Sequence, residues 1–297
     1  MLTLAPIADT PEAALARALP AAPYLRRLHD TGVAGHWRDA LQAVRDIPAA
    51  LPEAEAMAAM RRAKAQLHLS LAAEDLSGTL PVMSVTRALS EFAEECLEAA
   101  LRVTLARRSV DGAGIFAVAL GKMGAYELNY SSDIDICVFY DPDVFIAGDF
   151  TAGEMAQRIA RDIVRMMQES TGDGYVFRTD LRLRPDPSST PLAVSTRMAD
   201  VYYESVGQNW ERMVWIKGRP TAGDRACAER FLKVLTPFVW RRNLDYWAIG
   251  DIQAIKRMIN SKVGSAGLET VSPDVKLGPG GIREVEFFAQ TQQLILG

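Results

Sequence analysis

The chain has 297 residues, 49% of them apolar, which is enough for two or three domains with well-filled cores. Its 33 Lys and Arg against 37 Asp and Glu give a formal net charge of −4. A charge so small and mixed excludes a general attraction to nucleic acid or an anionic membrane, so any phosphate binding must be local. No apolar run reaches the roughly 18 residues of a membrane span, and no basic segment feeds an apolar stretch at the amino terminus. We therefore expect a cytoplasmic protein without nucleic-acid or membrane partners.

The positions of the cysteines and histidines limit the kinds of catalytic and metal-binding chemistry that the chain can carry. The three cysteines are far apart: Cys96, Cys137 and Cys227. This spacing predicts reduced, packed thiols and excludes Cys-x-x-Cys metal or redox chemistry. The three histidines all lie in the first quarter: His29, His36 and His68. Chemistry in the later chain therefore has no nearby histidine in the sequence.

Helical periodicity dominates the first third of the chain. Apolar residues recur at spacings of three and four from Met57 to Leu71. A break with Gly and Pro at 75–81 precedes a second long helix through Leu105, which we expect Ser84 to cap.

The middle of the chain alternates between strand and helix patterns. We expect strands at 115–120, 133–141 and 175–185, and a helix at 155–170. Gly121 ends the first strand, and a turn with a short helical segment leads to the second. This order predicts an α+β fold with a small mixed sheet.

Helical texture returns after Val201, with a Gly-Arg-Pro turn at 218–220, a helix at 226–240 and a last helix that starts near Ile282. That helix is still amphipathic at Gly297, so we expect a truncated parent. The predicted organisation is an amino-terminal helical module at 1–108, an α+β core at 109–225 and a truncated helical module at 226–297.

An Asp-x-Asp pair opens the second predicted strand. Side chains two apart on a strand share a face, so Asp133 and Asp135 project together while Ile134 enters the core. Two adjacent carboxylates repel unless a divalent cation lies between them. Magnesium fits oxygen ligands and bridges to phosphates, whereas zinc lacks His and Cys ligands here. The alternative is a turn with solvated carboxylates.

The third predicted strand adds an acid and arginines. On a strand, Asp180, Arg182 and Arg184 share one face, so Asp180 can complete a cluster of three carboxylates if the two strands are neighbours. The two arginines then offer forked donors to phosphate oxygens. This arrangement suits phosphoryl or nucleotidyl transfer. The alternative for both arginines is a salt-bridged outer face.

A glycine turn follows the first predicted strand. Gly121 and Gly124 permit close approach of backbone amides to phosphate, and the next helix offers its positive amino terminus. Lys122 is a candidate phosphate ligand or a solvent-facing lysine. Ser131 and Ser132 can add hydroxyl and amide donors ahead of the Asp-x-Asp pair. Each signal is weak alone, because the turn is neither a Walker A sequence nor a dinucleotide fingerprint.

Two further sets have structural interpretations. We expect the tryptophans to pack in cores or between domains rather than to stack on a base: Trp210, Trp215, Trp240 and Trp247. Glu284 and Glu286 open the last helix and favour its amino-terminal dipole, with a role in the cleft as the alternative.

The stretch GKMGAYELNYSSDIDICVFYD at 121–141 resembles the signature of the glutamine synthetase adenylyltransferase family, whose members also remove adenylyl groups. RAKAQLHLSLAAEDLSG, RTDLRLRPDPSSTPL, WERMVWIKGRPTAGD and VKLGPGGIREVEFFAQTQQLI resemble further family segments in the same order, so the resemblance covers about 57–297. It implies a polymerase-beta-like nucleotidyltransferase core flanked by helical modules.

The family motif carries over to named residues. It implies that Asp133 and Asp135 bind the metal, with Asp180 matched to the third acid, and that Gly121 and Ser132 belong to the phosphate-binding turn. The chain departs from the pattern twice. Met123 stands where Leu is expected, which is a swap of similar volume, and Tyr126 stands where Arg is expected, which removes a possible cationic contact.

The resemblance is closest to the amino-terminal half of the family enzymes and implies phosphorolytic removal of AMP from an adenylylated tyrosine of glutamine synthetase. Phosphate attacks and ADP is released, with one or two Mg²⁺ ions as cofactor; the other half attaches AMP from ATP. A PII nitrogen-signal protein is the implied regulator. Two alternatives stay open: a docking or nucleotide-sensing module for glutamine synthetase or PII without turnover, and adenylyl transfer in the forward direction or to another acceptor.

Overall fold

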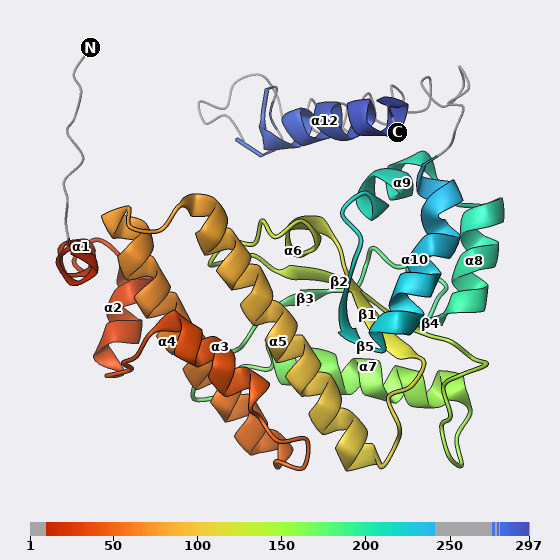
Figure 1. Cartoon of the computed structure of the whole chain (residues 1–297), viewed down its shortest axis with the longest axis horizontal. Coiled ribbons are helices and arrows are strands. Elements are labelled where there is room, and N and C mark those ends of the chain that lie inside the picture. Colours follow the sequence, from red (N-terminus) through yellow and green to blue (C-terminus); the bar gives the residue numbers. More distant parts are fainter. Residues whose placement is uncertain (1–9, 241–274, 277, 279, 297) are drawn as a thin grey trace.

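The computed structural model describes residues 10–240, 275–276, 278 and 280–296. An amino-terminal group of helices lies beside a small sheet, and further helices cover the sheet (Figure 1). The amino-terminal helices are α1 (Pro11–Ala18), α2 (Pro23–Asp30), α3 (Trp37–Arg45), α4 (Glu53–Ser77) and α5 (Val82–Arg108).

The two long predicted helices are confirmed as α4 and α5. Gly78 ends α4 in the left-handed conformation, at φ 73°. The predicted cap at Ser84 is wrong, because α5 begins at Val82 after Pro81 and the Ser84 amide already donates to the Pro81 carbonyl. Proline suits this position because its ring fixes a φ that a helix start accepts.

The sheet is mixed, with strand order β3-β2-β1-β5 and β4 paired to β2. β1 pairs antiparallel with β2 and β5, whereas β3 and β4 run parallel to β2. The strands are β1 (Ile115–Ala119), β2 (Ile134–Tyr140), β3 (Thr179–Asp180), β4 (Ala193–Ser195) and β5 (Arg219–Gly223). The sheet and its helices confirm the predicted α+β class.

One strand prediction and one turn prediction need correction. The third strand was predicted over 175–185 but is paired only at Thr179–Asp180, after which the chain turns. Pro185 has no amide hydrogen for a ladder, and Asp186 has φ 38°, which a strand does not accept. The Gly-Arg-Pro stretch was predicted as a turn, yet it opens β5, where Pro220 sits on the last strand of the path.

Three of the remaining helices follow the predicted positions, whereas α8 begins at Thr196, before the predicted return of helical character at Val201. The helices predicted at 155–170, 226–240 and from Ile282 are confirmed as α7, α10 and α12. In α7, Thr151 and Glu154 form a capping box. The elements are α6 (Gly121–Gly124), α7 (Ala152–Gln168), α8 (Thr196–Ser205), α9 (Asn209–Trp215), α10 (Arg225–Val239) and α12 (Ile282–Leu296).

β2 separates two apolar cores, because successive side chains of a strand point to opposite faces. Ile134 and Ile136 belong to the core shared with α3, α4, α5 and α7. Cys137 and Phe139 belong to the second core, which α8, α9 and α10 complete with residues such as Phe231. The three cysteines are free and buried, as expected.

The module boundaries at 108 and 225 stay predictions. α10, at the start of the third predicted module, packs on β1 and β5 of the sheet. The rest of that module lies partly outside the described residues, as does Trp247. Across the described part of the chain, no helix combines the length and apolar character needed to cross a membrane.

Candidate functional site

Three carboxylates lie together at the start of β2 and at β3. Asp133 directly precedes β2, Asp135 is its second residue, and the parallel register sets Asp135 beside Asp180. Ile134 and Ile136 are fully buried on the other face, so the pleat of the strand turns Asp135 away from that core. The register therefore brings together the three acids that the sequence singled out.

The environment of Asp135 penalises its negative charge. Its pKa rises from 3.8 to about 6, first because the carboxyl group is largely buried and then because Asp133 and Asp135 repel, with Asp180 adding to this. Arg182 and Lys276 act in the opposite direction and offset only part of the shift. A cation bound at this carboxylate would relieve the repulsion.

Asp180 has a different environment, because it is already paired. The Arg182 side chain donates from Nε to both carboxylate oxygens at 3.0 Å and from Nη2 to Oδ2 at 2.5 Å, and the Arg182 amide donates to Oδ1 at 2.8 Å. The hydrogen bonds from the Arg182 side chain hold the pKa of Asp180 below its ordinary value. The Arg182 side chain is itself 83% exposed, so it can leave Asp180 without disturbing the core.

The donor set fits a magnesium ion in part. Asp133 and Asp135 supply the carboxylate oxygens that Mg²⁺ prefers. The raised pKa of Asp135 indicates that nearby positive charge does not fully offset its burial and the repulsion from its acidic neighbours. Within the described residues, no three His, Cys, Asp or Glu side chains are grouped so as to hold a metal ion. Asp180 is paired with Arg182, so ligation by all three acids requires Arg182 to move.

The glycine turn of α6 lies directly against Asp135. Gly121 has φ 53°, and a Cβ atom at this position would overlap the Asp135 carboxylate. At the other end of α6, a Cβ atom on Gly124 would overlap the Lys217 carbonyl. Gly121 is therefore favoured by its positive φ and the close approach of the Asp135 side chain, and Gly124 by close packing of the backbone. Lys122 between them lines the cavity described next.

A cavity of about 560 Å³ opens in front of the carboxylates. One wall is polar and contains Gly121, Lys122, Asp133 and Asp135. The remaining lining comes from the segment after β3, from α9, from α12 and from two separate lysines. These residues are Leu183, Trp210, Met213, Val214, Lys217, Lys276, Arg283, Glu286, Phe287 and Gln290. Carboxylates and several cations thus share one cavity with an apolar patch.

The two predicted serines are engaged in their own loop. Ser132 Oγ donates to Asn129 Oδ1 at 3.0 Å, and the Ser131 amide donates to the same oxygen at 3.1 Å. The Ser131 carbonyl accepts from Arg178 Nη2 at 2.8 Å. Among the residues that the structure describes, neither serine lines the carboxylate cavity, so both shape the entry into β2.

The predicted placement of Arg184 beside Asp180 is wrong. Because the chain turns after Asp180, the Arg184 side chain points inward and is buried. Its guanidinium donates to four carbonyls of its own loop at 2.9–3.0 Å: Leu181, Pro187, Thr190 and Pro191. Arg184 therefore holds the loop together, whereas Arg182 pairs with Asp180, and the two side chains do not form one wall.

Sequence reasoning missed most of the far wall of the cavity. Trp210 was expected to pack, yet it is 39% exposed and lines the cavity, whereas Trp215 is buried in the second core as expected. Glu286 lines the cavity and pairs with Lys217 at 3.3 Å, which favours the alternative role in the cleft. Glu284 instead accepts from the Gly280 amide at the helix start. The signal available was the family-like character of 210–224 and 275–295.

Phosphate chemistry suits this cavity, because Asp133 and Asp135 line it together with Lys and Arg side chains. The fold is consistent with a nucleotidyltransferase-like α+β protein. The family model described as Glutamate-ammonia ligase adenylyltransferase matches residues 12–234. The chain belongs to this family. A second family model, described as GlnD PII-uridylyltransferase, matches residues 253–297.

Curated relatives named bifunctional glutamine synthetase adenylyltransferase/adenylyl-removing enzyme agree with this assignment. The chain is 49% identical to the one from Rhizobium meliloti over 96% of its own length and 30% of the relative. It is 50% identical to the one from Caulobacter vibrioides, over 90% of the chain and 28% of the relative. The chain thus spans less than a third of the length of these relatives.

Proposed function

We propose that this chain carries the adenylyl-removing site of a bifunctional glutamine synthetase adenylyltransferase, and that it acts as a metal-dependent nucleotidyltransferase. The observation that carries the proposal is the pair Asp133 and Asp135 on the wall of a cavity that also contains Lys122, Lys217 and Arg283. The names of the relatives support both directions of the chemistry, and the resemblance of the 121–141 segment to the amino-terminal half favours AMP removal.

In the proposed reaction, an oxygen of inorganic phosphate attacks the α-phosphorus of a tyrosyl-AMP ester on glutamine synthetase. A new P–O bond forms ADP, the bond to the tyrosine oxygen breaks, and the leaving phenolate takes up a proton. Asp133 and Asp135 would hold Mg²⁺, which supplies charge neutralisation at the transferred phosphorus. Gly121 lets the backbone approach the nucleotide, and Lys122 and Arg283 contact phosphate oxygens.

The apolar patch of the cavity is the proposed place of the adenine base. Leu183, Trp210, Met213, Val214 and Phe287 form this patch next to the carboxylates. A half-exposed indole offers a flat surface to a purine, which supports base binding at Trp210.

The finer assignments extend the same proposal. We assign the catalytic core to residues 109–225, with glutamine synthetase as protein substrate, PII as regulator and the cytoplasm as location. Residues 1–108 and 226–297 would flank this core as helical modules. These assignments concern the parent enzyme as much as the chain, because the relatives are more than three times longer than the matched region.

A docking module without turnover is the second candidate function. The specific observation in its favour is the pairing of Asp180 with Arg182, which withholds the third carboxylate from a metal. Such a module would bind glutamine synthetase or PII and a nucleotide without transferring the adenylyl group.

The deciding experiment incubates the chain with AMP-modified glutamine synthetase, Mg²⁺ and inorganic phosphate, with and without uridylylated PII, and measures ADP. We expect ADP from the wild-type chain and at least about a hundredfold less from the Asp135→Asn variant. A folded sample that yields no ADP in any PII state contradicts the proposal and favours the docking module. Release of pyrophosphate from ATP would instead indicate the forward transfer, to glutamine synthetase or another acceptor.

A further inference from the structure

Arg219, the first residue of β5, binds the far end of the glycine turn. Its Nε donates to the Gly124 carbonyl at 3.1 Å, and its Nη2 donates to the Met123 carbonyl at 3.0 Å. Its Nη1 pairs with Glu94 of α5. The side chain is only 17% exposed, so this guanidinium joins α5, β5 and α6 in a mostly buried position.

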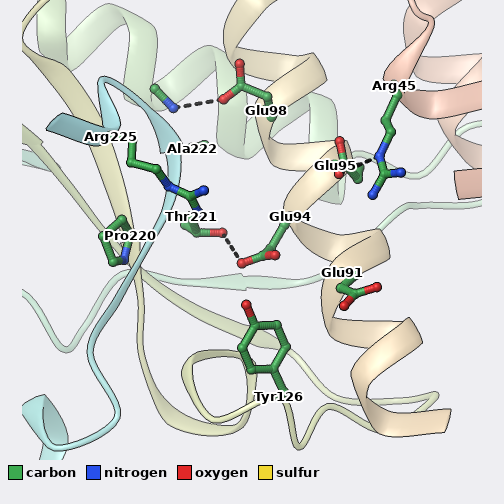
Figure 2. A pocket seen from close by; sticks show the side chains of 11 residues that line it. Arg45, Glu91, Glu94, Glu95, Glu98, Tyr126, Pro220, Thr221, Ala222 and Arg225 are labelled. Atoms are coloured by element: carbon green, nitrogen blue, oxygen red, sulfur yellow. Dashed lines mark hydrogen bonds and ion pairs between the residues drawn. The ribbon is translucent and has the colours of Figure 1, made fainter. Parts of the chain in front are cut away.

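Tyr126, one of the two residues that depart from the family pattern, also contacts Arg219. The guanidinium carbon of Arg219 lies 3.8 Å from the centre of the Tyr126 ring, and that of Arg87 lies 4.4 Å from it. Such stacking stabilises a cation on an aromatic face. Figure 2 shows the Tyr126 and Glu94 side chains directed into a second cavity, which has a volume of about 460 Å³. This cavity is distinct from the one lined by Asp133 and Asp135. Tyr126 therefore contacts Arg219 without lining the cavity that contains Asp133 and Asp135.

The backbone of α6 connects the carbonyls bound by Arg219 to Asp135. The helix has four residues, with Gly121 packed against Asp135 and Gly124 packed against the Lys217 carbonyl. Because α6 is a single turn, a shift of the carbonyls at Met123 and Gly124 would also displace Gly121. Protein interiors are close-packed, so such contacts pass displacement on rather than absorb it.

We propose that Arg219, supported by the Tyr126 ring, is a positioning residue for the nucleotide site. It fixes α6 so that Gly121 and Lys122 keep their places beside Asp133 and Asp135. The inference deepens the proposed function and rests on it, because it assigns the nucleotide to the carboxylate cavity. Arg219 touches no reacting group in this assignment, since it acts only through the carbonyls of α6.

The first test compares the Mg²⁺–ADP affinity of variants of the 297-residue chain by calorimetry. Arg219→Lys keeps a charge for Glu94 but cannot serve both carbonyls, so we expect affinity to fall about tenfold. Tyr126→Leu should weaken binding about threefold while Tyr126→Phe restores it, because the ring supplies the stacking.

Arg61→Lys is the matched control. Arg61 is also buried and donates to four carbonyls, none of which belongs to α6: those of Met57, Met166, Glu169 and Gly174. We expect Arg61→Lys to lower the melting temperature and leave the affinity of the folded protein unchanged. Equal losses of affinity in Arg61→Lys and Arg219→Lys, or no loss in Arg219→Lys, overturn the inference.

Amide hydrogen exchange separates the inference from the proposed function. The amides of Gly124, Ala125, Tyr126 and Glu127 all donate within the turn. We expect Arg219→Lys to speed their exchange about tenfold relative to Arg61→Lys without ligand. If the wild-type chain does not bind Mg²⁺–ADP, the proposed function fails, and unchanged exchange at these amides overturns the positioning role independently.

Discussion

β2 and the segment after β3 carry the same alternation of charged and apolar residues, yet they adopt different structures. The alternation at 133–136 lies on a strand that runs for seven residues, so Asp135 reaches the cavity while Ile136 enters the core. After β3 the chain turns at once, so Arg182 projects into solvent and Arg184 into the protein. Alternation therefore predicts a shared face only while the strand is paired, which is a tertiary property.

The largest effect is expected at β2. Asp135→Asn should lower ADP formation at least about a hundredfold, because charge neutralisation by a metal ion contributes several kcal/mol to the transition state. The fold should persist, since the change removes a repelled charge. Steady-state rates with AMP-modified glutamine synthetase measure the effect. Asp143→Asn, exposed beyond the other end of the strand, is the control and should retain the wild-type rate.

In the segment after β3, replacing Arg184 should lower the stability of the fold and not act on the reaction directly. Arg184→Met leaves buried carbonyls without their donors, so the free energy of unfolding should fall by about 3 kcal/mol. Urea denaturation measures this. Arg182→Met, two residues away but exposed, should leave the midpoint unchanged; equal losses in both variants would refute the contrast between the two arginines.

The pH dependence of Asp135 tests the carboxylate wall. Its folded pKa of about 6 lies above the ordinary 3.8, so the folded state holds more protons between these values, and stability falls as pH rises from about 4 to about 6. The loss is up to about 2 kcal/mol. Asp135→Asn should flatten this part of the curve in urea denaturation at a series of pH values. A wild-type curve without this slope would mean that Asp135 is not buried among like charges.

The smallest effect is expected at Arg182. Arg182→Gln frees Asp180, whose pKa Arg182 holds low, so Mg²⁺ should bind about fivefold more tightly in the absence of nucleotide. Titration calorimetry with Mg²⁺ alone measures it. Unchanged affinity would indicate that Asp180 does not take part in metal binding and that the β2 pair acts without it.

Particular residues show which parts of the fold and the site the sequence pattern predicts. A continuous apolar run predicted β1, and the apolar positions of 133–141 predicted which face of β2 carries Asp135, because burial of that face fixes the register. The same reasoning missed β5, since Arg219 and Pro220 lack an apolar pattern and pair only because β1 offers a free edge. It also missed Trp210, whose indole is exposed by the cavity rather than by any local pattern.

The sequence by itself determined the strand with its two acids, the glycine turn before it and the helices around them, because these follow from local periodicity and backbone preference. Tertiary structure decided that Arg184 is buried, that Arg182 neutralises Asp180, and that Lys217 meets Glu286 of α12 across the cavity. Those outcomes depend on which distant segments pack together. Residues such as Arg219 and Tyr126 acquire their role only from that packing, which no local pattern encodes.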